Sequence, residues 1–567
     1  MKRIVLLAAL ILLLAATGLF ADFAMDTSLA DSDASFWGEG TNDHAGYALS
    51  NVGDVNGDGY DDFIVGAPYN DEGGGDAGQA YLFLGKSSGW TMDTSLAEAD
   101  ASFMGEPGVS KAAACISGAG DVNGDGYDDF LIASFVSGQI YLILGKPSGW
   151  ARDTSLADSD ASFLGEGPSD WAGESVSGAG DVNGDGYDDF LIGARWNDEG
   201  GGDAGQAYLV FGKSSGWAMD TSLADSDASF WGEAPGDYAG DCSSAGDVNG
   251  DGYDDFLIGA DKNAEAGTNA GQTYLILGKA SGWAMDTSLS DADASFTGER
   301  SPAYSGWYLS GAGDVNADGY DDFLVGAIGD GEAGSYAGQV YLILGKASGW
   351  AMDTSLADSD ASFWGEAASD YAGGSSGGGD VNGDGYDDFI IGARNNGEGG
   401  AGAGQVYLIF GKSSGWAMDT SLADSDASFI GEAAGDYACG SYAVGGPLLG
   451  DVNGDGAGDL LIGAFGNSDG LVIARGQAYL IFGESPVGPE LSDPTHSPDY
   501  GRTDTDYTFT VHYYHAGGQA PSRIQVVVNG TPHDMSLDSG SAADGVYAWT
   551  GLIPEGGRAQ YHFEAED

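Results

Sequence analysis

A ten-residue string, DVNGDGYDDF, recurs seven times and constrains this chain more than any other feature of its sequence. The copies, complete or nearly so, begin at Asp54, Asp121, Asp181, Asp247, Asp314, Asp380 and Asp451. Their spacing of 60 to 71 residues is too long for a solenoid coil of one hairpin and suits a four-stranded blade. Seven such sheets around one axis close into a ring with only short edges. The repeat therefore predicts an all-β fold containing a seven-bladed β-propeller.

Each repeat contains four segments with the composition of strands. They are DASFWGE, a stretch such as ESVSGAG before the Asp string, DDFLIGA after it, and YLILG. The YLILG segment is the most apolar, so we expect it to be the innermost strand of the blade or the one next to it. No segment shows a sustained apolar period of 3.6 residues, so helices should be few.

The order of these segments predicts how the ring closes. The first SFWGE segment, Ser35–Glu39, precedes the first Asp string, and no such segment follows Tyr479–Gly483 in the seventh repeat. We expect the first segment to complete the last blade. Ser-Gly-Trp junctions separate the repeats, with tryptophans at Trp90, Trp150, Trp217, Trp283, Trp350 and Trp416. Packing between blades or over the YLILG strands is the favoured role of these indoles, and carbohydrate binding is the alternative.

The Asp string has the ligand pattern of a calcium loop. In the first copy, side-chain oxygens come from Asp54, Asn56, Asp58 and Asp62, and Tyr60 contributes its backbone carbonyl. A carboxylate-rich set of oxygens suits Ca²⁺, whereas Mg²⁺ takes fewer protein ligands and Zn²⁺ prefers His or Cys. An EF-hand begins similarly but needs a ligand at position twelve and a helix after the loop. Position twelve here is Val65, inside an apolar run, so the loop joins two strands.

The other six copies repeat this ligand set, which predicts about seven calcium sites. Their ligands are Asp121, Asn123, Asp125, Tyr127 and Asp129; Asp181, Asn183, Asp185, Tyr187 and Asp189; Asp247, Asn249, Asp251, Tyr253 and Asp255; Asp314, Asn316, Asp318, Tyr320 and Asp322; Asp380, Asn382, Asp384, Tyr386 and Asp388; and Asp451, Asn453, Asp455, Ala457 and Asp459. The fifth copy has Ala317 where the others have Gly, which predicts mild strain. The seventh keeps its site because position seven supplies only a carbonyl.

The net charge of −70 excludes a nucleic-acid binder and disfavours docking on anionic lipid. At the N-terminus, Lys2 and Arg3 precede an apolar run and small residues, which indicates a signal peptide over residues 1–21. A retained membrane anchor is the alternative. We expect a protein that is secreted or displayed at the cell surface, with no transmembrane anchor in the mature chain. The odd set of Cys115, Cys242 and Cys439 does not indicate a disulfide framework.

The seven Asp strings and the blade pattern resemble the FG-GAP repeats of integrin α-subunit β-propellers and their bacterial relatives. The string Gly66-Ala67-Pro68 matches the GAP element after the first Asp string. The resemblance covers residues 22–484 and implies a seven-bladed propeller with Ca²⁺ in loops on one face. In integrins the opposite face contributes to ligand binding and the propeller mediates adhesion. Integrins carry fewer calcium loops and need a β-subunit. Nothing here resembles their leg, membrane helix or tail, so an integrin β-type partner is not implied.

Two sets of loops should share the face opposite the Asp strings. The set after SFxGE contains Asp43-His44, Asp170-Trp171, Asp237-Tyr238, Tyr304, Asp370-Tyr371 and Asp436-Tyr437. The set after GAx spans 69–77, 195–204, 261–270, 328–337, 394–403 and 465–475, and its second copy is shortened to Phe135–Ser137, which opens a gap in the ring. Aromatic and acidic side chains there suit a sugar, a peptide or a cationic partner, although capping of the blade ends is the favoured role of the recurrent aromatics.

The repeat stops after Gly483, and four prolines mark a linker over residues 485–498. Alternating segments over 499–567 predict an immunoglobulin- or fibronectin-like β-sandwich, which we expect to continue beyond Asp567. No nucleophile with a paired acid and base is evident, so no catalytic site is predicted and the protein should not be an enzyme. The expected function is that of a calcium-binding, secreted protein for extracellular adhesion or ligand binding, with a protein or glycan ligand. The alternatives are a structural or surface-layer component, or the non-catalytic portion of a larger secreted hydrolase.

Overall fold

The computed structural model describes residues 23–107, 110–167, 169–331, 333–439, 448–468, 473–483, 490–497, 506–514, 523–528, 531–540, 544–552 and 561–566. The signal peptide predicted over 1–21 lies outside these residues. Within them, no helix is both long and apolar enough to cross a membrane.

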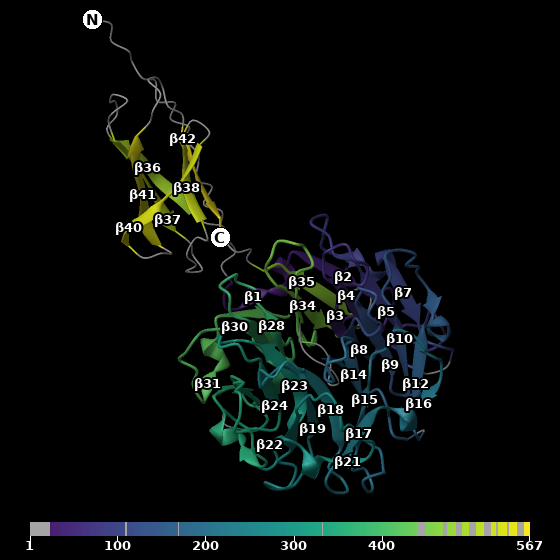
Figure 1. Cartoon of the computed structure of the whole chain (residues 1–567). Coiled ribbons are helices and arrows are strands. Elements are labelled where there is room, and N and C mark those ends of the chain that lie inside the picture. Colours follow the sequence, from purple (N-terminus) through teal and green to yellow (C-terminus); the bar gives the residue numbers. More distant parts are fainter. Residues whose placement is uncertain are drawn as a thin grey trace, which may run out of the picture.

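Seven five-stranded sheets radiate from a common axis (Figure 1), which confirms the seven-bladed β-propeller. The innermost strand of each blade is the Ser- and Gly-rich segment before the Asp string, because these strands contact one another around the axis. They are β3 (Leu49–Gly53), β8 (Cys115–Gly120), β13 (Ser175–Gly180), β18 (Ala239–Gly246), β23 (Ser305–Gly313), β28 (Ala372–Gly379) and β33 (Leu448–Gly450). Small residues suit this place: a Cβ on Gly178 would lie 2.9 Å from the carbonyl oxygen of Gly118 in the neighbouring blade.

The two apolar segments of each repeat form the middle of the blade. The second strands are β4 (Asp62–Ala67), β9 (Asp129–Ser134), β14 (Asp189–Ala194), β19 (Asp255–Ala260), β24 (Asp322–Ala327), β29 (Asp388–Ala393) and β34 (Asp459–Ala464). The third strands are β5 (Gln79–Phe83), β10 (Gln139–Ile143), β15 (Gln206–Val210), β20 (Gln272–Ile276), β25 (Gln339–Ile343), β30 (Gln405–Ile409) and β35 (Gln477–Ile481). The YLILG segment is therefore third from the axis, and its expected place was wrong. It is the most apolar because neighbouring blades bury both of its faces, whereas the inner strands line the axis.

The SFxGE segment forms the fourth strand, and a two-residue strand pairs with it in parallel at the outer edge. The fourth strands are β2 (Ala34–Trp37), β7 (Ala101–Met104), β12 (Ala161–Leu164), β17 (Ala228–Trp231), β22 (Ala294–Thr297), β27 (Ala361–Trp364) and β32 (Ala427–Ile430). The edge strands are β1 (Thr27–Ser28), β6 (Thr94–Ser95), β11 (Thr154–Ser155), β16 (Thr221–Ser222), β21 (Thr287–Ser288), β26 (Thr354–Ser355) and β31 (Thr420–Ser421). Sequence analysis did not anticipate the edge strands.

One turn of 3₁₀-helix follows each edge strand. These turns are η1 (Leu29–Asp31), η2 (Leu96–Glu98), η3 (Leu156–Asp158), η4 (Leu223–Asp225), η5 (Leu289–Asp291), η6 (Leu356–Asp358) and η7 (Leu422–Asp424). The serine before each turn caps it, as Ser28 does by accepting a hydrogen bond from the amide of Ala30. They are the only helical elements in the part of the chain that the structure describes, as the absence of a 3.6-residue period predicts.

The N-terminal segment closes the ring across two blades. Strand β2 pairs antiparallel with β35 of the last blade, with Phe36 opposite Ala478. Strand β1 pairs in parallel with β32 of the sixth blade, with Thr27 opposite Phe429. The predicted closure by the first SFWGE segment is therefore confirmed, and the residues before it extend the closure to a second blade.

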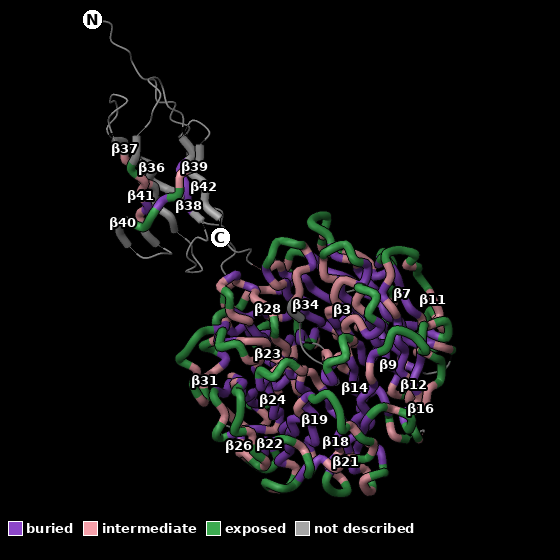
Figure 2. Tube along the Cα trace, in the orientation of Figure 1, coloured by how far each residue is buried: buried purple, intermediate pink, exposed green. Residues whose placement is uncertain are grey.

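The core lies between successive blades, where buried residues form a continuous layer around the ring (Figure 2). The junction tryptophans pack at its rim, as predicted. Trp90 contacts Phe36 and Phe63 with ring centroids 6.2 and 5.9 Å apart, and the Lys86 ammonium lies 4.3 Å from the indole. The three cysteines are buried and free.

The C-terminal strands form two sheets. One contains β36 (Glu490–Ser497), β37 (Asp506–Tyr514), β40 (Ser536–Gly540) and β41 (Asp544–Leu552); the other contains β38 (Arg523–Val528), β39 (Thr531–Asp534) and β42 (Tyr561–Glu566). Strand β36 falls inside the predicted linker of 485–498. Its proline, Pro494, is tolerated because the register with β37 shifts between Ser492 and Thr495. The immunoglobulin-like sandwich stays a prediction.

Candidate functional site

Each Asp string forms a tight loop between the first and second strands of its blade; we call these seven nonapeptides the Asp loops. The Asp54 carboxylate braces the first loop from inside. It accepts hydrogen bonds from the amides of Gly57 at 2.7 Å, Asp58 at 3.0 Å and Gly59 at 2.7 Å. Gly57 and Gly59 have φ of +74° and +91°, a region that favours glycine. Glycines at positions four and six thus let the loop wrap around its first carboxylate.

The ninth residue anchors the Asp loop to the blade. Asp62 is fully buried and accepts hydrogen bonds from the amides of Gly85 at 2.7 Å and Val55 at 3.0 Å. Burial, followed by the nearby charges of Asp58 and Asp54, raises the pKa of Asp62 to about 8. The ninth residues of the other loops have the same raised pKa: Asp129, Asp189, Asp255, Asp322, Asp388 and Asp459. Burial therefore disfavours the charged form of the ninth residue in every loop.

The donor chemistry of the loops fits Ca²⁺. A carboxylate has about four lone pairs, and Asp54 uses three on backbone amides, so oxygens remain for a cation. Among the described residues, no three His, Cys, Asp or Glu side chains form a ready-made metal cluster. The loops thus present oxygen donors that backbone hydrogen bonds hold in place.

The eighth residue of the string has a role that sequence analysis missed. Asp128 of the second loop accepts a hydrogen bond from the amide of Asp54 in the first loop at 2.8 Å, and its own amide donates to the Asp54 carbonyl at 3.3 Å. We call this reciprocal pair the inter-loop clasp. A Cβ on Gly53 would lie 2.1 Å from Asp128 Oδ2, so the residue before the loop has to be glycine. The recurrence of Asp at position eight is the sequence feature that could have indicated this contact.

The clasp recurs around the ring with one exception. The carboxylates of Asp188, Asp254, Asp321, Asp387 and Asp61 accept from the amides of Asp121, Asp181, Asp247, Asp314 and Asp451, respectively. The seventh loop has Gly458 at position eight and therefore offers the sixth loop no carboxylate. The backbone bond from the Gly458 amide to the Asp380 carbonyl, at 2.8 Å, is kept between these two loops.

The seventh residue adds an apolar contact between the same loops. A Cβ on Gly57 would lie 2.6 Å from the Tyr127 ring of the next loop, so the tyrosine packs directly on glycine. In the fifth loop, Ala317 takes this place with φ of +55°, which confirms the expected strain. In the seventh loop, Ala457 replaces the tyrosine that would pack on the sixth loop.

The sixth Asp loop, next to these replacements, has a different internal arrangement. The Asn382 side chain accepts a hydrogen bond from the Asp384 amide at 2.9 Å. In the third loop, by contrast, the Asn183 side chain donates to Asp189 at 3.1 Å. The missing clasp and the missing tyrosine are thus accompanied by a changed position-three ligand in the loop that they would have supported.

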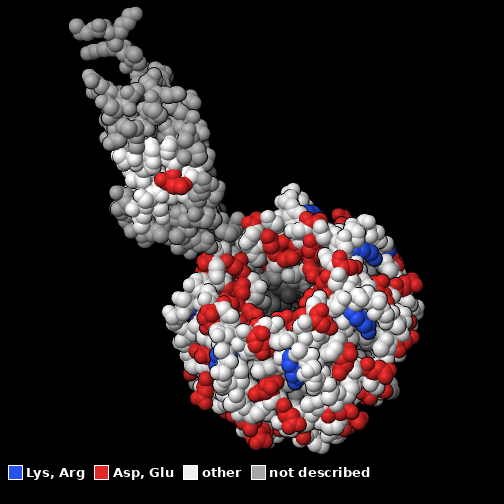
Figure 3. All heavy atoms as spheres, viewed as in Figure 1, with Lys and Arg blue, Asp and Glu red and all other residues white. Residues whose placement is uncertain are grey.

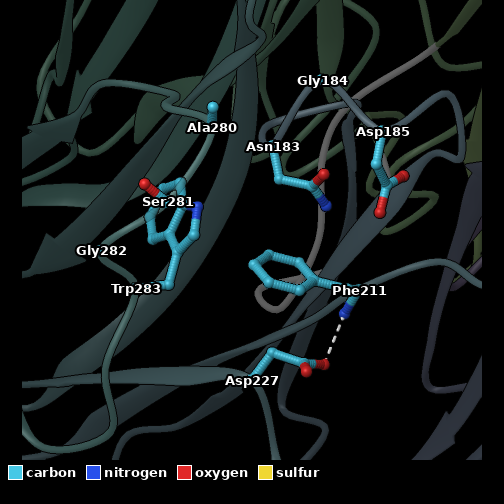
Figure 4. Close-up of a pocket in the computed structure, with 9 residues that line it drawn as sticks. All are labelled: Asn183, Gly184, Asp185, Phe211, Asp227, Ala280, Ser281, Gly282 and Trp283. Atoms are coloured by element: carbon cyan, nitrogen blue, oxygen red, sulfur yellow. Dashed lines mark hydrogen bonds between the residues drawn. The ribbon is translucent and has the colours of Figure 1, made fainter.

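Shallow hollows adjoin the Asp loops at the blade junctions (Figure 4). One has a volume of about 600 Å³ and is lined by Asn183, Asp185, Phe211, Asp227 and residues 280–283. Its indole, Trp283, stacks on Phe256 with centroids 6.0 Å apart, and the Lys279 ammonium lies 4.6 Å from the ring. Because this ring already has partners, packing explains it better than carbohydrate binding.

The opposite end of the blades carries both predicted loop sets; we call this end the loop face. Its recurrent acids support the loops. Asp43 is buried and accepts hydrogen bonds from Gly40 at 2.5 Å and from the Asn70 side chain at 3.4 Å. Glu39 accepts a hydrogen bond from the buried hydroxyl of Tyr81 at 3.0 Å. Sequence analysis expected these acids around a ligand. Asp43 and its equivalents Asp237, Asp370 and Asp436 are instead buried, and they support the loops.

The aromatic residue after these acids keeps an unusual backbone conformation. It has φ between +53° and +58° at His44, Trp171, Tyr238, Tyr304, Tyr371 and Tyr437. A left-handed conformation costs a non-glycine residue about 1–2 kcal/mol, so each ring is held against a preference of its backbone.

An ionic cluster joins the third and fourth blades at the loop face. Arg195 is buried and donates to the Asp261 carboxylate, with Glu174 and Asp241 both 3.9 Å away. Its guanidinium lies 4.7 Å from the Trp307 ring of the fifth blade. Burial raises the pKa of Asp241 despite the nearby Arg195 charge. This cluster is a further contact between blades.

Among the charged side chains on the face that Figure 3 shows, acidic ones are the more numerous. In Figure 3 they surround the central opening of the propeller, and lysines and arginines are few and scattered. The cations of the loop face are largely occupied by the chain's own rings. Lys262 lies 3.7 Å from the Tyr238 ring, Lys111 lies 4.4 Å from Tyr69, and Arg394 lies 5.2 Å from Tyr371.

Comparison with known proteins shows which repeat family and which proteins the chain is similar to. A family profile described as FG-GAP repeat matches residues 45–83, 172–210, 243–276, 306–343 and 372–409. Chicken integrin alpha-8 is 31% identical over 209 residues, 34% of this chain and 19% of that protein. Chicken integrin alpha-V is 28% identical over 220 residues, 37% of this chain and 19% of that protein.

Fruit-fly integrin alpha-PS2 is 34% identical over 103 residues, 18% of this chain and 7% of that protein. The similarity thus spans about a fifth or less of these relatives. The chain is a seven-bladed β-propeller in which five repeats match the FG-GAP profile, and its sequence is similar to part of the integrin α-subunits.

Proposed function

We propose that this protein is a secreted, non-catalytic propeller that is rigidified by calcium and binds a protein or glycan outside the cell. The observation that carries the proposal is the ring of seven Asp loops at one end of the blades, opposite a face of loops that differ from blade to blade. The first set suits a structural cation, and the second suits a ligand.

Calcium would be held in each loop by the side chains at positions one, three, five and nine and by the carbonyl at position seven. In the first loop these residues are Asp54, Asn56, Asp58, Asp62 and Tyr60. When bound, the ion would neutralise the carboxylates that crowd the loop. The loop's own residues do the rest: Asp54 braces the turn, and Asp62 fixes it to the second strand.

The homology to integrin α-subunits supports a binding role rather than catalysis, and supports a place outside the cell. The signal-peptide pattern of residues 1–21 agrees with export. A structural role in a surface layer is the second candidate, favoured by the regular recurrence of nearly every residue class around the ring. It predicts self-association that increases with calcium.

The test is retention of the mature protein on bacterial cells, on eukaryotic cells and on insoluble polysaccharides, each with Ca²⁺ and with EDTA. Thermal unfolding of the same samples reports whether EDTA also unfolds the propeller. The proposal predicts retention in Ca²⁺ that EDTA abolishes. Absence of retention on every surface, with calcium-dependent oligomers in sedimentation, would favour the structural role instead.

A further inference from the structure

One backbone contact recurs around the propeller at the positions that carry the aromatic residues of the loop face. The loop between the second and third strands of one blade extends over this position in the next blade. A carbonyl of the loop accepts a hydrogen bond from the backbone amide at that position. The donor–acceptor pairs are His44 to Ala474, Lys111 to Asp76, Tyr238 to Asp203, Tyr304 to Asn269, Tyr371 to Tyr336 and Tyr437 to Gly402, at 3.0 to 3.2 Å. We call the accepting segment the covering loop.

The covering loop also contacts the side chain that it covers. The Tyr238 hydroxyl donates to the Asp203 carboxylate at 3.4 Å. The Tyr371 ring stacks on Tyr336, with centroids 5.5 Å apart and planes 28° from parallel. The space above these residues is thus filled by the chain itself, once by a polar side chain and once by a flat ring.

The third blade breaks the rule at Trp171. The segment that should cover it is the short turn between β9 and β10, Phe135–Gly138, which is several residues shorter than the other covering loops. Over the described residues, no covering-loop carbonyl accepts the Trp171 amide. The side chain of Trp171 is 42% exposed, and that of Val136 in the short turn is 41% exposed. Within the described ranges no covering loop extends over Trp171, and its exposure is slightly greater than the 37% of Tyr437, which has one.

Trp171 is nevertheless held in a fixed place. Its ring contacts Phe135 and Trp196, with centroids 5.8 and 5.4 Å apart. The Trp196 amide donates to the carbonyl of Asp170, which ties the third-blade loop to the neighbouring residue. The left-handed φ of +53° adds a constraint on the backbone. A large, exposed, pre-ordered indole loses little entropy when a ligand stacks on it.

The loops around Trp171 carry the carboxylates of Asp170 and Asp198. Asp170 and Asp198 lie close enough for their charges to interact. Two cations of this part of the loop face are already engaged: Arg195 is bonded to Asp261, and Lys262 lies 3.7 Å from the Tyr238 ring and 5.8 Å from the Trp196 ring. Carboxylates accept hydrogen bonds from hydroxyl groups and repel anionic ligands. An exposed indole face can pack against the C–H face of a sugar ring.

We propose that the gap above Trp171 is a binding site for a neutral polysaccharide, in which one pyranose ring stacks on the indole. This inference rests on the proposed function and specifies the ligand class of its loop face. A basic peptide could also approach an acidic surface. The flat ring of Tyr336, which stacks on Tyr371 in the equivalent place, favours a ring-shaped ligand.

The test is co-sedimentation of the mature protein, in Ca²⁺, with insoluble cellulose, chitin, xylan and amylose. The variants are Trp171→Ala, Trp171→Phe and Tyr437→Ala. Tyr437 is the matched control, because it is exposed on the same face but is covered through the Gly402 carbonyl. Thermal unfolding of each variant shows whether the propeller is intact. We expect retention on at least one polysaccharide, a loss of tenfold or more in Trp171→Ala, a smaller loss in Trp171→Phe, and no loss in Tyr437→Ala.

Equal losses in Trp171→Ala and Tyr437→Ala, or no loss in either, would overturn the assignment of the site to Trp171. Retention on cells that trypsin treatment of the cells abolishes, without retention on any polysaccharide, would overturn the glycan inference while leaving the proposed binding function in place. Absence of retention on every cell and every polysaccharide would count against both.

Discussion

Six junctions between neighbouring Asp loops are alike, and the junction between the sixth and seventh loops is not. At the regular junctions a carboxylate at position eight clasps the amide of the preceding loop, and at five of them a tyrosine packs on its glycine. The odd junction has Gly458 and Ala457 at these places and keeps the backbone bond from the Gly458 amide to the Asp380 carbonyl. The sixth loop beside it rearranges Asn382. The comparison teaches that each candidate calcium loop is shaped by the loop after it as well as by its own ligands.

The family comparison shows the same division. The five segments that match the FG-GAP profile leave out the second and seventh repeats. The second repeat has the short turn that uncovers Trp171, and the seventh lacks the clasp. The irregular repeats are thus the ones that give the ring an open aromatic on one face and a weak junction on the other.

Removal of calcium should have the largest effect, and it should act on every junction. One site at 100 times its Kd contributes about 2.7 kcal/mol, so loss of several sites should lower the Tm by many degrees. Differential scanning calorimetry in Ca²⁺ and in EDTA measures the change. Because the clasps hold neighbouring loops, we expect the transition to become broader in EDTA. An unchanged Tm would show that the loops do not bind metal.

A second weak junction can be made by Asp61→Gly, which copies position eight of the seventh loop. It removes the acceptor of the Asp451 amide, and a hydrogen bond to a charged group contributes about 1.5–3 kcal/mol. Chemical unfolding should show a loss of that size. Asp61→Asn keeps an acceptor oxygen and serves as the control. If both variants lose the same stability, the clasp is not the reason.

The reverse substitution, Gly458→Asp, should repair the odd junction. A Cβ there would lie 3.6 Å from the Asp380 carbonyl oxygen and from Val381, an ordinary contact distance. We expect a gain of about 1 kcal/mol and slower hydrogen exchange of the Asp380 amide, as measured by mass spectrometry. Unchanged exchange at Asp380 would mean that the sixth loop is held open by something other than the missing carboxylate.

The smallest expected effect is that of Ala317→Gly in the fifth loop. Relief of the left-handed strain should stabilise the protein by about 0.5–1 kcal/mol in urea unfolding. The matched control is Gly57→Ala in a regular loop, which should destabilise it because a Cβ there would lie 2.6 Å from Tyr127. A loss of stability in Ala317→Gly would contradict the strain seen at that residue.

The sequence predicts the architecture well because the repeat is long and regular. The number of blades and the closure by Ser35–Glu39 follow from the order of the segments alone. Strand order within the blade was harder to predict, because apolarity marks the middle of a blade that is covered on both faces rather than its axis. The clasp of Asp128 was missed because a nonapeptide read as a ligand list does not show which carboxylate points to the next loop. The exposure of Trp171 depends on a loop of the preceding blade, so the repeat that contains Trp171 does not reveal it.

The most direct test of the account is the calcium stoichiometry of the folded protein, measured by isothermal titration calorimetry of the metal-free form and by elemental analysis after dialysis. The account predicts about seven equivalents per chain, with Asp58→Ala losing one equivalent and leaving the others bound. Binding of no calcium, or loss of no equivalent in Asp58→Ala, would contradict the assignment of the Asp loops as the metal sites that hold the propeller together.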